Sequence, residues 1–490
     1  MLSLKNLDKA DYEKKQGKKI DRELPYFITI MSLLASSGLG PYTMLQKIKE
    51  INLLPVIRSE SIKILQRIDM LGIDPLTALS QAKDKPSSKA LGEFLSGYVS
   101  AIQSGGNVVN YLKSKMLSSY DRLENLEKQS VEKLSGIVHA WLTMQIVILA
   151  VFILIAAIGS NPMTGSASST GSDPPYMLLI FSPVISIAFM KIVQNMNKSN
   201  IPELEIKKIL KFGLPPFLIA MILLGTNLLS SLHANAYILG ISLVAASIWP
   251  ALKFRKLYVA NLHAEAATPQ ILRDITEARK AGMGPEKCIV HACKRKDFKS
   301  FNIVANSIAN KLEWGIPLSN MFETLQNEVK NFQVLISFRI LFEIITSGGG
   351  NVNTLDSLAD ASEKIHNISK TKRDMLQPYV IVGFMLIVIT GFTTLLTIDS
   401  FADINQEKNL GRPTQQPEQP NSLLEVVSIA VVAQAWLAGL FIGKITNGAY
   451  SGGFMYSIML TIITMASIGM IQLHVINIGA ILTKPSTPSS

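Results

Sequence analysis

Three potential metal ligands lie close together in the sequence, as Cys288, His291 and Cys293. Thiolate and imidazole groups at such spacings can bind zinc, but a structural zinc site takes four ligands, and no fourth is evident nearby. A matching stretch earlier in the chain has a methionine and two lysines at these positions, so that stretch holds no metal ligands. We therefore expect neither a metal nor another cofactor.

A second stretch, with Gly439, Gly443 and Lys444, resembles a phosphate-binding loop. A Walker A loop has four residues between its glycines, whereas here there are three, and Ile445 occupies the Ser/Thr position. Together with Ala435, the two glycines form a face of small residues that lets membrane helices approach closely. We predict helix packing here. Because the chain shows no Ser/His/Asp set, metalloprotease motif or paired carboxylates either, we expect no enzymatic activity.

Basic residues concentrate between positions 253 and 300, where eleven Lys or Arg stand against five Asp or Glu. One interpretation is a docking face for an acidic protein partner. The other is topological, because positive residues stay on the cytoplasmic side of a membrane and contact anionic lipids. Nucleic acid is disfavoured, since no aromatic residues alternate with the charges. The candidate docking residues are Lys294, Arg295, Lys296, Lys299, Lys207 and Lys208.

A glycine-rich turn occurs twice and indicates an internal duplication. Gly105 matches Gly349 at a shift of 349 − 105 = 244 residues, and the same shift aligns other glycines and prolines. Glycine ends a helix in the left-handed conformation, and asparagine caps the next helix. No Lys-Ser or Lys-Thr follows, so a phosphate loop is disfavoured. The turn residues are Gly38, Pro41, Gly105, Gly106, Asn107, Gly282, Pro285, Gly349, Gly350 and Asn351.

The composition is that of a membrane protein. Hydrophobic residues make up 48% of the 490 residues and charged residues only 17%, with a formal net charge of +11. The apolar residues gather in blocks long enough to cross a bilayer as helices. The first such block lies beyond residue 100, so we expect no signal peptide. Two cysteines cannot form a disulfide framework.

We predict an all-α, polytopic membrane protein with about seven transmembrane helices and two duplicated cytoplasmic helical bundles. Residues 108–135 and 352–377 contain no Gly or Pro, so each bundle should end in a long helix that leads to the membrane. The spans are expected at about 137–158, 176–193, 214–232, 236–254, 378–398, 423–443 and 454–482. The domains are a charged lead-in (1–23), the first bundle (24–135), four spans (136–256), the second bundle (257–377), three spans (378–482) and an external tail (483–490).

The basic residues also predict the orientation of the chain. Segment 191–211 carries five lysines, whereas the loop at 159–175 has no Lys or Arg. The bundles and the N-terminus should therefore be cytoplasmic and the C-terminus external. The predicted spans have no Asp, Glu, Lys or Arg at mid-depth, although ion and substrate paths usually need such groups. A transporter or channel is the alternative function that this pattern disfavours.

The recurring motifs resemble the type II secretion F family. Bacterial members usually have three spans and a Gly-Glu-x-Gly form of the late motif, whereas this chain has seven predicted spans and no Glu there. It therefore looks more like the archaeal branch. The motifs in the first half are Leu24-Pro25, Ser37–Pro41, Gly72–Leu76 and Ser104–Val108, and those in the second half are Ala281–Pro285, Trp314–Leu318 and Ser347–Val352.

The resemblance implies a role in assembling an archaellum, a type IV pilus or a secretion pseudopilus. A member of this family is a membrane platform on which a cytoplasmic hexameric ATPase acts, so that pilin-like subunits enter a filament. The implied partners are that ATPase, the pilin-like subunits, membrane lipids and a second copy of the chain in a homodimer. In mechanical terms, we expect the two long helices to act as rigid levers between bundle and membrane.

Overall fold

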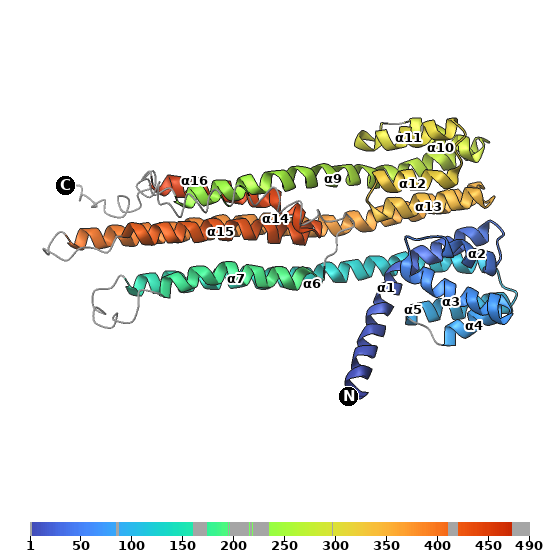
Figure 1. Ribbon diagram of the computed structural model, residues 1–490, viewed down its shortest axis with the longest axis horizontal. Helices are drawn as coiled ribbons and strands as arrows, with labels where there is room; N and C mark the ends of the chain where they lie inside the picture. The colour runs from blue at the N-terminus through green and yellow to red at the C-terminus, as the bar shows by residue number, and fades with distance from the viewer. Residues whose placement is uncertain are drawn as a thin grey trace, which may run out of the picture. The chain divides into compact units, whose positions relative to one another are not determined.

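The computed structural model describes residues 2–84, 88–159, 174–194, 196, 215, 218, 235–295, 297–409 and 420–472. Every regular element within these ranges is a helix, which confirms the all-α fold class (Figure 1). Most of the predicted span 214–232 and the whole predicted tail 483–490 lie outside the described residues. The same is true of Lys207, Lys208 and Lys296.

The first half of the chain begins with short helices that prolines start and glycines end. Proline is the first residue of α2 and α3, where its missing N–H costs no helical hydrogen bond. Gly72 ends α3 in the left-handed conformation. The helices are α1 (Leu2–Ser36), α2 (Pro41–Lys49), α3 (Pro55–Leu71), α4 (Pro75–Asp84), α5 (Lys89–Gln103) and α6 (Val108–Gly159).

The second half repeats this order of helices at nearly the same spacing. α10 begins 285 − 41 = 244 residues after α2, and α14 begins 352 − 108 = 244 residues after α6. The helices are α9 (Asn235–Lys280), α10 (Pro285–Arg295), η3 (Lys299–Phe301), α11 (Asn302–Glu313), α12 (Leu318–Glu328), α13 (Phe332–Thr346) and α14 (Val352–Asn409). We interpret the common shift as the product of a duplication.

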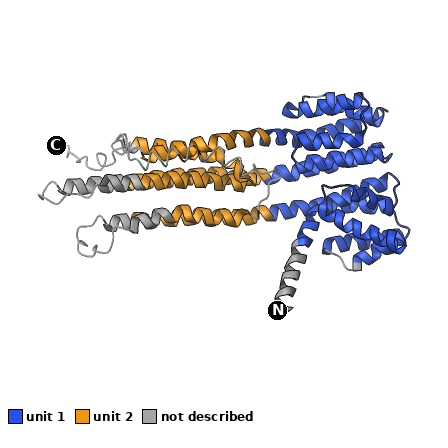
Figure 2. Ribbon diagram, viewed as in Figure 1, with its two compact units in different colours: residues 1–129, 258–372 blue, residues 130–257, 373–490 orange. Residues whose placement is uncertain are grey.

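The chain divides into two compact units (Figure 2). Unit 1 contains residues 1–129 and 258–372, and unit 2 contains residues 130–257 and 373–490. One hydrophobic core in unit 1 draws buried side chains from both halves of the chain, such as Phe94 and Phe338. The Tyr26 and Phe332 rings meet edge to face across the halves, with centroids 5.2 Å apart. The segments that the sequence assigns to separate bundles therefore share one core.

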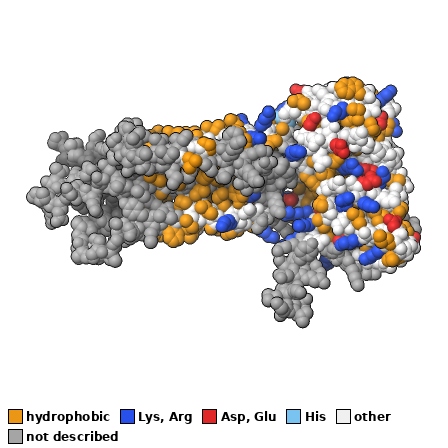
Figure 3. All heavy atoms as spheres, viewed as in Figure 1, with side chains coloured by type: hydrophobic (Ala, Val, Ile, Leu, Met, Phe, Trp, Pro, Cys, Tyr) orange, Lys and Arg blue, Asp and Glu red, His pale blue; other side chains and the backbone are white. Residues whose placement is uncertain are grey.

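Five helical segments among the described residues are long and apolar enough to span a membrane. Two of them involve α15 (Pro420–Asn447) and η4 (Tyr450–Gly452) with α16 (Phe454–Gln472). α7 (Pro174–Gln194) contributes only a shorter apolar stretch, so the total of seven spans stays a prediction. The five segments are Val108–Leu154, Asn235–Lys280, Val352–Thr397, Val427–Asn447 and Tyr450–Met470. Hydrophobic side chains gather on the described surface of unit 2 and charged ones on unit 1 (Figure 3).

The structure extends three helices beyond the boundaries that the sequence indicated. α1 joins the charged lead-in to the first bundle helix, and its Ile20 is fully buried in the core. α14 continues through Pro378, where the sequence suggested that a new helix begins. α9 joins the predicted fourth span to the second bundle without interruption. Proline removes one helical hydrogen bond but does not have to end a helix whose neighbouring residues are packed.

Candidate functional site

Two glycine-rich turns connect α5 to α6 and α13 to α14. Gly105 has a φ of 67°, and Asn107 Oδ1 caps α6 by accepting the N–H of Asn110 at 3.0 Å. In the second turn, the left-handed residue is Gly348, with a φ of 79°, one position before the glycine that the constant shift matches to Gly105. The extra glycine in this turn accounts for the difference, and Asn351 again caps the next helix by accepting the N–H of Thr354 at 2.8 Å.

The other two glycine turns form the corners before α2 and α10. Gly38 and Gly282 have φ values of 83° and 88°, and Pro41 and Pro285 begin the helices that follow. These turns fix the direction of the chain between helices of unit 1. The geometry gives the glycines a role in shaping the backbone, and Gly349 and Gly350 belong to the same kind of corner.

The basic candidates lie on the exposed face of α10. Cys288, Ile289, Ala292 and Cys293 form the buried face of this helix. The opposite face and α11 border an open groove, and neither Lys287 nor Glu313 was singled out by the sequence pattern. The helical period of α10 could have identified Lys287, because it follows the spacing opposite the buried cysteines. The groove is lined by Glu286, Lys287, Val290, His291, Lys294, Arg295, Leu312 and Glu313.

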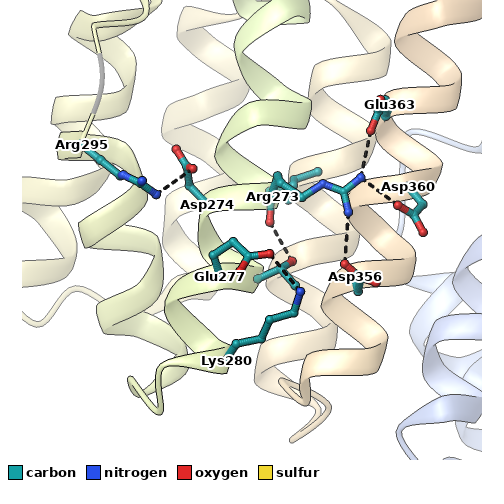
Figure 4. A network of polar contacts seen from close by, with 10 residues as sticks. Arg273, Asp274, Glu277, Lys280, Arg295, Asp356, Asp360 and Glu363 are labelled. Atoms are coloured by element: carbon teal, nitrogen blue, oxygen red, sulfur yellow. Dashed lines mark hydrogen bonds and ion pairs between the residues drawn. The ribbon is translucent and has the colours of Figure 1, made fainter.

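Two of the predicted docking residues are engaged in ion pairs within the chain. Lys294 Nζ lies 2.7 Å from a carboxylate oxygen of Glu313, and both side chains are exposed. Arg295 lies 3.0 Å from Asp274, whose side chain is only 8% exposed (Figure 4). A carboxylate that is buried needs such a partner, because an unpaired buried charge is costly. Lys299 is placed apart from them, with a φ of 55° in the turn that leads into η3.

Ion pairs also connect the helices that surround this face. The Arg273 guanidinium on α9 contacts Asp356, Asp360 and Glu363, three carboxylates of α14, at 2.9 to 3.1 Å (Figure 4). The three acids follow one another at helical spacings of four and three residues, so they share one side of α14. The cluster fixes the α9–α14 pair within unit 1 and leaves Arg273 unavailable as a docking cation.

α6 and α14 contact one another in register. In unit 1, Lys364 pairs with Asp121 at 2.6 Å and Lys372 pairs with Glu127 at 2.8 Å. The partners are 364 − 121 = 243 and 372 − 127 = 245 residues apart, close to the repeat shift. In unit 2, the hydroxyls of Ser135 and Tyr379 meet at a separation of 244 residues. Each long helix therefore faces its counterpart in the other half of the chain.

The potential zinc ligands do not converge. Cys288 and Cys293 are buried in the core, whereas His291 is exposed and borders the groove. Among the described residues, no group of three or more His, Cys, Asp or Glu side chains could hold a metal ion. Burial raises the pKa of the Cys293 thiol to about 12 and also raises that of Cys288. Both cysteines behave as core residues.

The small residues of α15 pack against the start of α16, which confirms the predicted close approach of helices. A Cβ atom added to Gly443 would lie 2.0 Å from the Cα atom of Gly453, and one added to Gly439 would lie 2.3 Å from that of Ser457. Lys444 is buried and donates to the carbonyl of Gly448 at 2.7 Å. The lysine therefore caps the end of α15.

Comparison with known proteins identifies the family. The sequence model of the family described as "Type II secretion system (T2SS), protein F" matches residues 27–159 and 271–398, more than half of the chain. The two segments begin 271 − 27 = 244 residues apart, the shift between the glycine turns. Uncharacterized protein MJ1286 of Methanocaldococcus jannaschii is 21% identical over 431 residues, which cover 79% of this chain and 69% of that protein.

No solved structure matches the chain. The fold, the apolar helices and the glycine turns agree with the family match in both halves of the sequence. The chain therefore belongs to the type II secretion system protein F family.

Proposed function

We propose that this protein is the membrane platform of a type IV filament assembly machine, which builds an archaellum, a pilus or a pseudopilus. A cytoplasmic hexameric ATPase docks on unit 1, and its motion drives the insertion of pilin-like subunits at unit 2. One observation carries the proposal: α6, α9 and α14 each contribute residues to both units. A continuous helix transmits force along its axis better than a flexible loop, so these helices suit a coupling role.

The ion pairs between α6 and α14 support joint motion of these two helices. Lys364–Asp121 and Lys372–Glu127 tie them together at two levels of unit 1. A push or torque on either repeat would then reach both helices. We extend the lever hypothesis to α9, which is also continuous.

The proposal includes the orientation and the assembly state. Unit 1 and the N-terminus face the cytoplasm, and the C-terminus is external, because lysines concentrate beside the spans on one side. The protein acts as a homodimer surrounded by lipids, binds no nucleic acid, and leaves ATP hydrolysis to its partner.

The docking face can be tested without disturbing the fold. Arg295 should be left in place, because it neutralises the buried Asp274 carboxylate. The test variant is Lys294→Glu/Lys296→Glu/Lys299→Glu. The control, Lys63→Glu/Lys89→Glu/Lys128→Glu, changes the net charge equally, at lysines that pair with glutamates of their own helices.

The full chain in lipid nanodiscs would be titrated with the secretion-type ATPase of the same cell at several salt concentrations. The proposal predicts salt-sensitive binding that the test variant loses and the control keeps. Binding that survives the test variant would assign the basic run to lipid contact. Failure of the wild-type protein to bind at any salt concentration would contradict the platform function and favour a transporter.

A further inference from the structure

Trp314 is an exposed indole on a rigid corner of unit 1. Its side chain is 78% exposed, which is unusual for so large an apolar group. The backbone is fixed, because the N–H of Trp314 donates to Asn310 O at 3.1 Å and the N–H of Gly315 donates to Leu312 O at 3.0 Å. Gly315 then turns the chain with a φ of 79°. The corner thus presents the indole to solvent without the entropy cost of ordering a loop.

The indole lies next to the groove between α10 and α11. Glu313, the residue before it, lines this groove together with Lys287, Lys294 and Arg295. α11 contributes a mostly uncharged outer face, on which Ile303 is also 78% exposed. Because 11 residues bring a helix back to nearly the same side, Ile303 and Trp314 share that face. An apolar anchor and a basic groove therefore adjoin.

The first repeat provides an internal comparison. At 314 − 244 = 70 it carries Met70, which is 78% exposed as well. The positions that correspond to Lys287, Lys294 and Arg295 are Thr43, Glu50 and Ile51, so that repeat has no basic groove. The exposed apolar corner is common to both repeats, whereas the basic groove and the indole occur together only in the second.

We propose that Trp314 and the α10–α11 groove form one docking site for an acidic surface of a protein partner. The indole enters an apolar pocket of the partner, and carboxylates around that pocket face Lys287, Lys294 and Arg295. Tryptophan and arginine are the residues that most often dominate binding energy at interfaces, and the surrounding charges speed association and set specificity. This inference rests on the proposed function, so the partner is the assembly ATPase.

The affinity test uses the full chain in nanodiscs and the ATPase of the same cell. Trp314→Ala should weaken binding at least about tenfold, and Trp314→Phe should lose less. Met70→Ala is the matched control, since it removes an equally exposed apolar side chain from the other repeat. It should leave binding unchanged. Equal affinity of wild type and Trp314→Ala would overturn this inference while the platform function stands.

A fluorescent label can report where the partner binds. The only two cysteines are buried, so a cysteine introduced by Asn310→Cys would take a polarity-sensitive label one turn from Trp314. The control is Gln66→Cys, at the matching position 310 − 244 = 66. The ATPase should shift the emission of the first label and leave the second unchanged.

Three outcomes of the labelling experiment would count against the site. A shift of both labels would indicate a general change, and a shift of neither in the presence of bound ATPase would place the contact elsewhere. A shift of the Asn310→Cys label on incorporation into nanodiscs, before ATPase is added, would show that this corner contacts lipid. Absence of ATPase binding to the wild type would instead contradict the proposed function itself.

Discussion

Single glycines shape the corners of unit 1. Gly38, Gly72, Gly282, Gly315 and Gly348 have φ values between 63° and 88°, a region that other residues enter only at a cost. The sequence located these corners well, because glycine followed by proline or asparagine has few structural uses. It could not identify Gly348 as the left-handed residue of its turn, since three consecutive glycines look alike in sequence.

A serine scan tests the backbone requirement at one corner. Gly282 and Gly284 both have open space where a Cβ would lie, but only Gly282 has a positive φ. We expect Gly282→Ser to lower the free energy of unfolding by about 1–2 kcal/mol. Gly284→Ser should have little effect. Thermal unfolding of the two variants in the same detergent would measure the difference, and equal melting temperatures would contradict the strain argument.

Burial of the cysteines predicts their reactivity. Since burial raises the pKa of Cys293 to about 12, almost no thiolate is present at pH 8. A thiol reagent should therefore label neither cysteine in the folded protein and both after denaturation. Because the folded-state pKa exceeds the ordinary value, this contribution to stability is complete at neutral pH and is lost as pH rises towards 12. Rapid labelling of the native protein at pH 8 would contradict the buried placement.

At the scale of elements, the α15–α16 pair depends on backbone contact. Gly443→Ala would force a methyl group into the backbone of Gly453 and should cost about 2 kcal/mol or more. The control is Gly136→Ala on α6, where no atom lies within 4 Å of the added Cβ. That change should be neutral or stabilise the helix by up to about 1 kcal/mol. Melting temperatures in detergent would compare them, and an unaffected Gly443→Ala protein would refute the close packing.

The continuity of α6 can be tested by breaking it. Leu126→Pro removes a helical hydrogen bond at a partly exposed position and should cost about 3 kcal/mol locally. If α6 is a lever, the protein should still insert in the membrane but filament assembly should stop. Leu126→Ala removes the same side chain without the break and should assemble filaments normally. The measurement is a count of filaments per cell, and normal filaments in the proline variant would refute the lever.

At the scale of the whole molecule, the sequence predicted local structure better than contacts between distant residues. Apolar blocks and Gly-Pro corners indicated the helices and the family, because these signals are local. The shared core of unit 1 and the pairs Arg295–Asp274 and Lys364–Asp121 depend on how helices pack. No spacing in the sequence encodes those contacts. Trp314 appeared in a motif, but only the structure showed its exposure.

The central claim is that this chain is required to build a filament. The most direct test is to delete its gene, count surface filaments by electron microscopy and measure where the pilin-like subunits accumulate. The platform account predicts that filaments disappear, that the subunits remain in the membrane, and that the wild-type chain restores assembly. Normal filaments in the deletion strain would contradict it.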